Sequence, residues 1–402
     1  MQIQPILAAL RRHRMAAFLI GMEIALACAI LCNALFLITN CLDMMDVDSG
    51  VDQDRLVVIS LDGIDDAGTT DMVARLRAGF AGIAGVESVA VGNAVPFTQR
   101  AGEMGFRIVA DDPHFNQQGH FYVGGQKFAA TLGLRLAKGR WFTPDEYGPM
   151  DDFLPESPSI MLDAAYAQKL WPDQDPLGKT IYTGDDASYR VIGTYASLVR
   201  PDPNPYARHN TLLLAGMPGV HLSSVYALRT TPEQAERVLR DARAVVTRVA
   251  PTVVVEKEHS GTMLALRHAF FAGDRAMASL LVGVIAALLL VTALGIVGLA
   301  SFWVAQRRRQ IGVRRALGAT RADILRYFQT ENFLIVTGGI VLGMALVYAL
   351  NLLLMTHYEL PRLPLFYLPV GALALWGLGQ LAVLGPALRA AAVPLVVATR
   401  SV

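Results

Sequence analysis

Few residues in this chain have the types and spacing that a catalytic or nucleotide site requires. Gly178, Lys179 and Thr180 resemble the end of a phosphate-binding loop, in which backbone amides and a lysine hold nucleotide phosphates. That motif also requires a glycine five residues before Gly178, where this chain has Asp173. The eight histidines show no His-Glu-x-x-His spacing and no paired cysteine and histidine spacing, and no Gly-x-Ser-x-Gly turn occurs. The sequence therefore predicts no ATP site, no metal site and no covalent catalysis, and we do not expect this chain to be an enzyme.

The most informative segment is basic and partly apolar, and covers residues 306–320. Seven arginines occur between 307 and 326. Arginine alone could keep such a loop on the cytoplasmic side of a membrane. The amphipathic pattern of Ile311, Leu317, Ile324 and Leu325, however, needs a protein partner or the lipid surface. From the residues alone, three alternatives stay open: an interfacial helix, a docking helix for a cytoplasmic protein, and a free loop.

The elements that position this segment are predicted to be membrane spans. Hydrophobic residues make up 53% of the 402 residues and charged residues 17%, whereas soluble proteins have roughly 25% charged residues. A helix that crosses the hydrocarbon core needs about 20 apolar residues. Segments 16–40, 276–306, 328–356 and 366–388 meet this length, and in the third the uncharged stretch begins after Glu331. We therefore expect an α-helical membrane protein with four transmembrane helices.

Basic residues near the span ends predict the orientation, because they are retained on the cytoplasmic side. They occur in the amphipathic segment 1–15, in 307–327 and in the tail 389–402, whereas the short turn 357–365 has only Arg362. Residues 41–275 contain 22 basic and 30 acidic residues, a balance of −8, and the remainder contains 13 and 4, a balance of +9. Both termini are thus expected in the cytoplasm and 41–275 outside. The first span could be a cleaved signal peptide, but its apolar run exceeds roughly 7–15 residues, so we favour a retained anchor.

Two features inside the spans are candidates for helix contacts. Glu23 is the one acidic residue within the first span, and burying its charge in the membrane is costly. It either pairs with a partner helix or carries a proton in neutral form, or else it reaches Arg14 or the headgroups, which we favour. Gly339 and Gly343 have the Gly-x-x-x-Gly spacing that allows helix backbones to approach closely. Glycine is also simply common in membrane helices, and this alternative stays open.

The external block, 41–275, is predicted to be an α+β domain of two subdomains inserted between the first two spans. Strands are expected at 56–61, 86–91, 224–228 and 252–256, and helices at 70–80 and from Thr231 onward, where Pro232 suits the first helical position. These two strand-helix-strand units, about 50–104 and 216–258, bracket an outer insert at about 105–215 with short strands at 159–162 and 189–195. A stalk helix, about 260–275, is expected to continue without a break into the second span.

Residues 307–331 read RRRQIGVRRALGATRADILRYFQTE, and this segment resembles the cytoplasmic signature of the MacB/FtsX-like family of ABC transporter permeases. GRWFTPDE at 139–146, SIMLDAAYAQKLWPDQDPLGKTI at 159–181 and YRVIGTY at 189–195 resemble the external domain of its MacB branch. PALRAAAVP, at 386–394, resembles the C-terminal end. The resemblance thus extends over nearly the whole chain and has the same order of spans and external domain.

The resemblance implies that 307–319 forms the element that couples the permease to an ATPase. The coupling residues carried over from the family are Arg307, Arg308, Arg309, Gln310, Ile311, Gly312, Arg314, Arg315, Ala316, Leu317, Gly318 and Ala319. Of these, we expect Arg315 and Leu317 at the ATPase contact itself. Gln310 stands where the family usually has Glu, which removes a carboxylate that could pair with a basic residue.

The function implied by the resemblance is transmission of ATP-driven motion to a periplasmic domain, to export or extract a peptide, lipoprotein, drug or similar substrate. The expected partners are two copies of a separate ABC ATPase, which would bind ATP and Mg, and a second permease chain in a homodimer or heterodimer. A periplasmic adaptor, an outer-membrane channel and membrane lipids are further expected partners, and nucleic acid is not. The expected location is the bacterial inner membrane. The alternative is an FtsX-like subunit that regulates a cell-envelope hydrolase or sensor.

Overall fold

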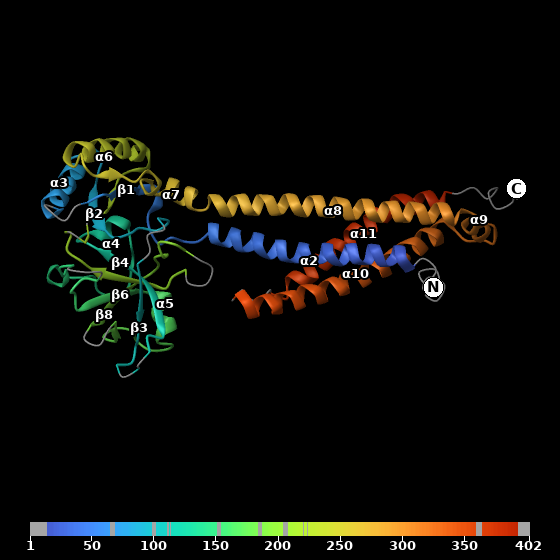
Figure 1. The fold of residues 1–402 in the computed structure, drawn as a ribbon, viewed down its shortest axis with the longest axis horizontal. Coiled ribbons are helices and arrows are strands. Elements are labelled where there is room, and N and C mark those ends of the chain that lie inside the picture. The colour runs from blue at the N-terminus through green and yellow to red at the C-terminus, as the bar shows by residue number, and fades with distance from the viewer. Residues whose placement is uncertain are drawn as a thin grey trace. The chain divides into compact units, whose positions relative to one another are not determined.

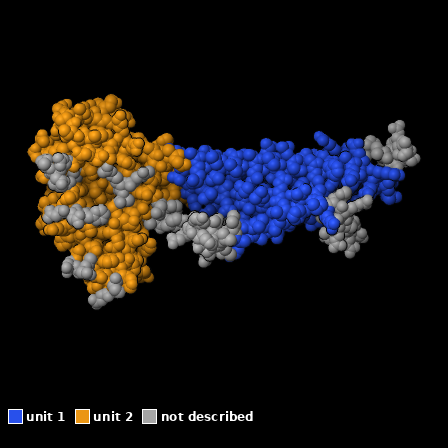
Figure 2. Space-filling view, viewed as in Figure 1, with its two compact units in different colours: residues 1–42, 274–402 blue, residues 43–273 orange. Residues whose placement is uncertain are grey.

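The computed structural model describes residues 14–64, 69–98, 102–110, 112, 114–150, 154–183, 187–203, 208–219, 221–222, 224–358 and 364–392. The chain divides into two compact units, which Figure 2 shows in different colours. We call residues 1–42 with 274–402 the membrane unit, and residues 43–273 the α+β unit. Most of the N-terminal segment 1–15, part of the turn 357–365 and most of the tail 389–402 lie outside the described residues.

The membrane unit contains four helices that are long and apolar enough to cross a membrane. They are α2 (Arg14–Met45), α8 (Ala272–Gln306), α10 (Arg321–Tyr358) and α11 (Tyr367–Ala391), and α10 and α11 pack against each other (Figure 1). Their shared core includes Ile24 of α2, Ile296 of α8 and Val336 of α10. Many large apolar side chains point outward, as lipid contact requires. The prediction of four transmembrane helices with an α+β domain between the first and second is confirmed.

Twelve strands form one sheet in the described part of the α+β unit. One half contains β1 (Leu56–Asp62), β2 (Ser88–Gly92), β10 (Val225–Arg229), β11 (Val254–Val255) and β12 (Gly261–Thr262). The other half contains β3 (Gly102–Phe106), β4 (Gln117–Gly124), β5 (Leu136–Gly139), β6 (Ser159–Asp163), β7 (Thr180–Tyr182), β8 (Ser188–Tyr195) and β9 (Thr211–Ala215). The order is β11-β1-β10-β2-β4-β9-β6-β8-β5, with β12 on β1, β3 on β4 and β7 on β8. Only β4 with β9 and β6 with β8 are parallel among these pairs of described strands.

The two halves of the sheet join at a single residue pair. Strands β2 and β4 pair only where Gly92 faces Gly124. The ring of Phe128 covers both glycines, so that a Cβ on Gly92 or Gly124 would lie 2.3 Å or 2.4 Å from it. The first half comes from the two ends of the external block and the second from its middle. The predicted subdomains are thus two halves of one sheet with a narrow joint.

Helices cover both faces of this sheet. On one face lie α3 (Thr69–Ala81), α5 (Ala164–Leu170) and α6 (Ala235–Val249), with α3 and α6 side by side (Figure 1). On the other face lie α4 (Phe128–Leu132) and α7 (Met263–Phe270). Strand β1 sends Val57 and Ile59 to the first face and Val58 to the second, which explains its continuous apolar run. Short 3-10 turns occur at Gln53–Arg55, Pro144–Glu146, Pro232–Gln234 and Lys257–His259.

One predicted helical continuity is wrong. The expected unbroken stalk helix is interrupted at Phe271, which has φ −85° and ψ 14° and separates α7 from α8. The physical reason is that Phe271 is buried and its ring packs edge-on against Phe97 and Phe270, which fixes the backbone at this point. The helix predicted from Thr231 is confirmed: Thr231 is the N-cap, Pro232 opens a 3-10 turn that ends at Gln234, and the chain is α-helical from Ala235.

Candidate functional site

The basic segment forms a short helix that lies between two spans. Helix α9 (Arg308–Ala316) follows α8 after Arg307, whose φ of −100° and ψ of 11° turn the chain. Ile311 is buried against Val304 of α8 and against Ile324 and Phe328 of α10. The free-loop alternative is therefore wrong, because the segment is helical and its residue Ile311 packs in the membrane unit.

A buried ion pair fixes the turn between α8 and α9. Arg307 Nη1 donates hydrogen bonds of 3.0 and 2.9 Å to the two carboxylate oxygens of Glu331 in α10. The side chains are only 10% and 2% exposed, and the Arg307 guanidinium also lies over the ring of Trp303, 5.5 Å from its centroid. Because the Arg307 guanidinium is removed from water, loss of Glu331 would leave a buried positive charge without this carboxylate. The start of α9 is therefore fixed to α10.

A tight turn fixes the other end of α9. Gly318 has φ +102°, and its amide donates to the carbonyl of Arg315 while the amide of Ala319 donates to that of Arg314. This pattern is a Schellman motif, in which a left-handed glycine ends a helix. Thr320 and Asp323 then form a reciprocal cap at the start of α10, with the Thr320 amide donating to Asp323 at 2.9 Å. Both ends of α9 thus have defined geometry.

The predicted coupling residues divide into a held set and an exposed set. Arg307, Ile311 and Gly312 are buried, and Arg315 and Ala319 are half-buried. The remaining residues are exposed: Arg308, Arg309, Gln310, Arg314, Ala316, Leu317 and Gly318. Leu317 is 84% exposed and Val313 is 44% exposed, which is unusual for apolar residues on a helix otherwise rich in arginine. We call the surface formed by Val313, Leu317 and the exposed arginines the α9 face.

Glu23 and the paired glycines lie at contacts between spans. A Cβ on Gly295 of α8 would lie 2.8 Å from a carboxylate oxygen of Glu23. Oε1 of Glu23 has no hydrogen-bond partner among the described residues. A Cβ on Gly339 would lie 2.8 Å from the Cβ of Ile24, and one on Gly343 would lie 2.6 Å from the carbonyl oxygen of Ala25. The Gly-x-x-x-Gly surface of α10 therefore lies against α2, and the Glu23 carboxylate lies against α8.

Sequence reasoning missed the polar groups that connect the spans. Glu331 marked only the boundary of the third span, whereas in the structure it is the buried partner of Arg307. Asn332 is the first residue after Glu331 in the same span, and its side-chain amide donates to the carbonyl of Gly379 in α11 at 2.8 Å. The available signal was the opposite charge of Arg307 and Glu331 at the facing ends of two consecutive spans, which a helical hairpin brings together.

The GRWFTPDE motif at 139–146 builds a rigid loop in the α+β unit. Glu146 accepts from Arg140 at 2.6 and 2.8 Å, from the Thr143 amide at 2.8 Å and from Ser159 at 2.5 Å. The Arg140 guanidinium, followed by these other donors, holds the pKa of Glu146 well below its usual range. Gly139 has φ +80°, and a Cβ there would lie 2.3 Å from the Ile192 carbonyl oxygen. This part of the resemblance thus has a structural explanation.

A single arginine joins the two chain segments that lead out of the α+β unit. Arg267 of α7 donates to the carbonyls of Met45 and Val47, at 2.7 and 2.8 Å, and to the side chain of Gln53 at 3.0 Å. The guanidinium also lies over the ring of Phe97, 5.4 Å from its centroid. Met45 is the last residue of α2, so Arg267 satisfies a carbonyl at the C-terminal end of that helix. Displacement of α7 relative to this end of α2 would break these bonds.

One arrangement in the α+β unit has the residue types of a hydrolase but not the geometry. The Ser197 hydroxyl lies 3.4 Å from Nδ1 of His209, and Oδ2 of Asp163 lies 3.6 Å from the same atom. A catalytic triad requires the hydroxyl and the carboxylate on opposite ring nitrogens. Asp163 instead caps α5, accepting from the Ala165 amide at 2.8 Å. In the part of the chain that the structure describes, no group of histidine, cysteine and carboxylate side chains could hold a metal ion.

Comparisons with known proteins agree with this arrangement. A family model described as the MacB-like periplasmic core domain matches residues 16–245, and one described as the FtsX-like permease C-terminal matches residues 282–395. The macrolide export ATP-binding/permease protein MacB of Neisseria meningitidis is 25% identical over 268 residues, covering 65% of this chain and 39% of the relative. That of Chromobacterium violaceum is 28% identical over 268 residues, covering 62% and 38%. The chain thus spans about two fifths of the length of the curated relatives it matches.

Solved structures of external domains are also similar to this chain. The periplasmic region of MacB from Actinobacillus actinomycetemcomitans matches with 11% identity and a TM-score of 0.37, covering 57% of this chain and 98% of that one. The extracellular domain of the noncanonic ABC-type transporter YknZ from Gram-positive bacteria matches with 15% identity and a TM-score of 0.34, covering 50% and 100%.

Proposed function

Because this chain belongs to the MacB/FtsX-like family of ABC transporter permeases, we propose that it is a permease subunit that transmits ATP-driven motion to its α+β unit. It would lie in a bacterial inner membrane with both termini in the cytoplasm and the α+β unit in the periplasm. The arginines on α9 and Arg14 at the start of α2 support this orientation. The chain itself carries out no bond chemistry in this proposal.

The observation that carries the proposal is the α9 face. A positive-inside loop needs only charge, and a helix lying in the headgroups would bury its apolar residues in lipid. In α9, Ile311 is buried in the membrane unit, so Val313 and Leu317 remain available to a different partner. An apolar side chain that is 84% exposed within a ring of arginines is suited to insert into a pocket with an acidic rim on a cytoplasmic protein.

The proposed partner is an ABC ATPase on a separate subunit, present in two copies and binding ATP and Mg. The curated relatives are named ATP-binding/permease proteins, which supports assigning the nucleotide chemistry to an ABC ATPase in this proposal. A second permease chain, either identical or related, would complete the transporter. Motion of the ATPase would reach α8 and α10 through the two fixed ends of α9, at Arg307 and Gly318.

The proposed cargo is a peptide, lipoprotein, drug or similar molecule that is exported or extracted on the periplasmic side. Transport would extend to a periplasmic adaptor and an outer-membrane channel where these exist. An FtsX-like role in regulating an envelope hydrolase or sensor is the alternative. The match of the MacB-type domain model to residues 16–245 favours the transporter role, because that match covers most of the α+β unit.

A charge placed on the α9 face tests this proposal. Leu317→Glu should reduce co-purification with the proposed ABC ATPase, and transport-coupled ATP hydrolysis, by at least tenfold, because an acidic group cannot enter an apolar pocket with an acidic rim. The fold should be preserved, because the Leu317 side chain is 84% exposed. Val254→Glu, which changes a 62% exposed residue of the α+β unit, is the matched control. Unchanged co-purification and hydrolysis in Leu317→Glu would refute the docking assignment.

A further inference from the structure

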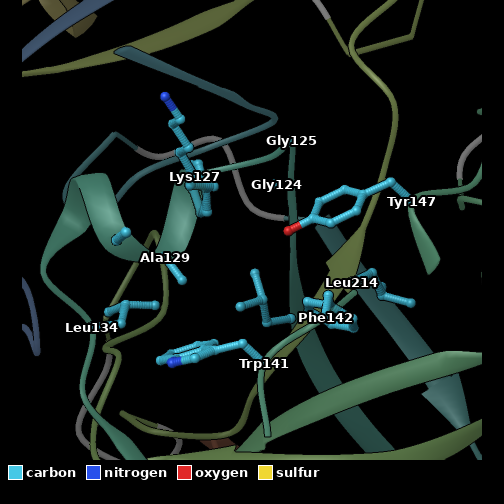
Figure 3. Close-up of a pocket in the computed structure, with 12 residues that line it drawn as sticks. Gly124, Gly125, Lys127, Ala129, Leu134, Trp141, Phe142, Tyr147 and Leu214 are labelled. Carbon is cyan, nitrogen blue, oxygen red and sulfur yellow. The ribbon is translucent and has the colours of Figure 1, made fainter. Parts of the chain in front are cut away.

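A cavity lies beside the joint between the two halves of the sheet, entirely within the α+β unit. Its volume is about 340 Å³, and its walls come from the end of β4, helix α4, the loop 141–147 and strand β9 (Figure 3). Ligand pockets in proteins have volumes of about 300–1,000 Å³, so this cavity is at the small end of that range. Neither the ATPase coupling nor the membrane spans involve this part of the chain.

The walls of the cavity are held in place without a ligand. The loop that carries Trp141, Phe142 and Tyr147 is fixed by the buried Glu146, which accepts hydrogen bonds from Arg140, Thr143 and Ser159. On the opposite side, α4 is held because the ring of Phe128 lies against the two glycines of the joint. Binding to a preformed cavity costs less conformational entropy than binding to a site that the ligand must first order.

The lining combines apolar surface with a few hydrogen-bond donors. Leu134, Phe142 and Leu213 supply apolar surface, and the Tyr147 hydroxyl points toward the centre, near Gly124 (Figure 3). Lys127, which is exposed, also lines the cavity. Burial, followed by the neighbouring Glu146 charge, raises the pKa of Tyr147, so the phenol stays protonated and able to donate.

From this geometry we propose that the cavity binds a small aromatic molecule that carries a carboxylate or a similar acceptor. The rings of Trp141, Phe142 and Tyr147 would stack with or enclose the aromatic body. Tyr147 would donate a hydrogen bond to the acceptor, and Lys127 at the rim would favour a negative charge. An ammonium group in the same position would face the donor hydroxyl of Tyr147 and the positive charge of Lys127, so the cavity should discriminate against cations.

Two probes with the same ring system test the proposal in the full chain reconstituted in nanodiscs. 2-Naphthoate should bind saturably, and 2-naphthylmethylammonium should bind at least tenfold more weakly, as measured by calorimetry with empty nanodiscs subtracted. Ala129→Phe, which fills the cavity from α4, should reduce naphthoate affinity at least tenfold. Tyr147→Phe, which removes one hydroxyl, should reduce it by about 2–10-fold. Lys127→Glu should reverse the preference between the two probes.

Controls separate the cavity from other sites and from misfolding. Lys169→Gln removes an exposed positive charge on α5, outside the cavity, and should leave both affinities unchanged. Circular dichroism checks that each variant folds. If Ala129→Phe does not fold, Tyr147→Phe and Lys127→Glu still test the proposal. The proposal is overturned by an absence of saturable naphthoate binding at millimolar concentration, by equal affinity for the two probes, or by affinities that the cavity variants do not change.

Discussion

The buried pair of Arg307 and Glu331 gives the sharpest prediction, because it connects the turn before α9 to α10. The Arg307 nitrogen lies 2.9 and 3.0 Å from the two carboxylate oxygens of Glu331, and the two side chains are 10% and 2% exposed. Two unit charges about 4 Å apart attract by about 4 kcal/mol at an effective dielectric constant of about 20. Glu331→Gln removes this attraction and leaves the guanidinium buried, so the free energy of unfolding should fall by about 3–5 kcal/mol.

A double-mutant cycle separates the pair from its surroundings. Arg307→Met should also destabilise the chain, and Arg307→Met combined with Glu331→Gln should cost less than the sum of the two single changes, because the attraction between the two charges is lost only once. The coupling free energy should be at least about 2 kcal/mol. Arg308→Met, the change at the exposed neighbour, should stay within about 0.5 kcal/mol of wild type.

The assay is unfolding of the purified chain in mixed micelles, titrated with SDS and followed by far-ultraviolet circular dichroism. The same variants are then tested for co-purification with the ATPase, since a released α9 should also weaken docking although the α9 face itself is unchanged. The reasoning is refuted if Glu331→Gln loses less than about 1 kcal/mol, or if the cycle gives a coupling near zero.

Three further predictions concern other parts of the chain. Gly339→Ala should destabilise the membrane unit in the same SDS assay, because its Cβ would lie 2.8 Å from the Cβ of Ile24. Gly338→Ala should be neutral, because a Cβ there would have no atom within 4 Å. Equal effects of the two changes would refute the contact with α2. Glu146→Gln should destabilise the α+β unit by about 1.5–3 kcal/mol. The pKa of Glu146 is depressed below its ordinary value of 4.5, so the loss of unfolding free energy in this variant should be full above pH 4.5 and should shrink as the pH falls below it. Urea unfolding followed by tryptophan fluorescence measures this loss, and a loss that does not depend on pH would contradict the prediction. Gly318→Ala should lower the free energy of unfolding by about 1–2 kcal/mol, and Gly318→Asn should lower it less, because asparagine tolerates the left-handed backbone. Equal losses of the two variants in thermal unfolding would show that the positive φ of Gly318 is not the cause.

The spans could be predicted from the sequence because their signal is local. A helix in the membrane pairs its backbone groups within one segment, so length and apolarity are sufficient. The strands β1 and β2 and the helix α3 were likewise predicted within a few residues, since each has a continuous apolar run or an apolar face. The break at Phe271 was missed because its cause is a contact with Phe97, 174 residues earlier in the chain, which no local pattern indicates.

The sequence could predict which residues form the candidate site, but not how these residues are arranged. The segment 307–319 was identified from its arginines and apolar residues, but the sequence could not indicate that Ile311 is buried while Leu317 is exposed. That division depends on the angle set by Arg307 at one end of α9 and Gly318 at the other. The cavity beside the sheet joint was missed for a similar reason, since Lys127 and Tyr147 come from loops whose distance depends on the packing of Phe128.

The partner of Arg307 also changes the meaning of the charge pattern. The sequence treats every arginine in 307–327 as a contribution to orientation in the membrane, and the sign of the loop predicts the cytoplasmic side. Arg307, however, is neutralised by Glu331 inside the membrane unit, so its charge contributes little to the field outside. Arg308, Arg309 and Arg314 on the exposed side of α9 keep that role. Arg307 should therefore be a positioning residue whose loss changes stability and docking while the orientation of the chain in the membrane stays the same.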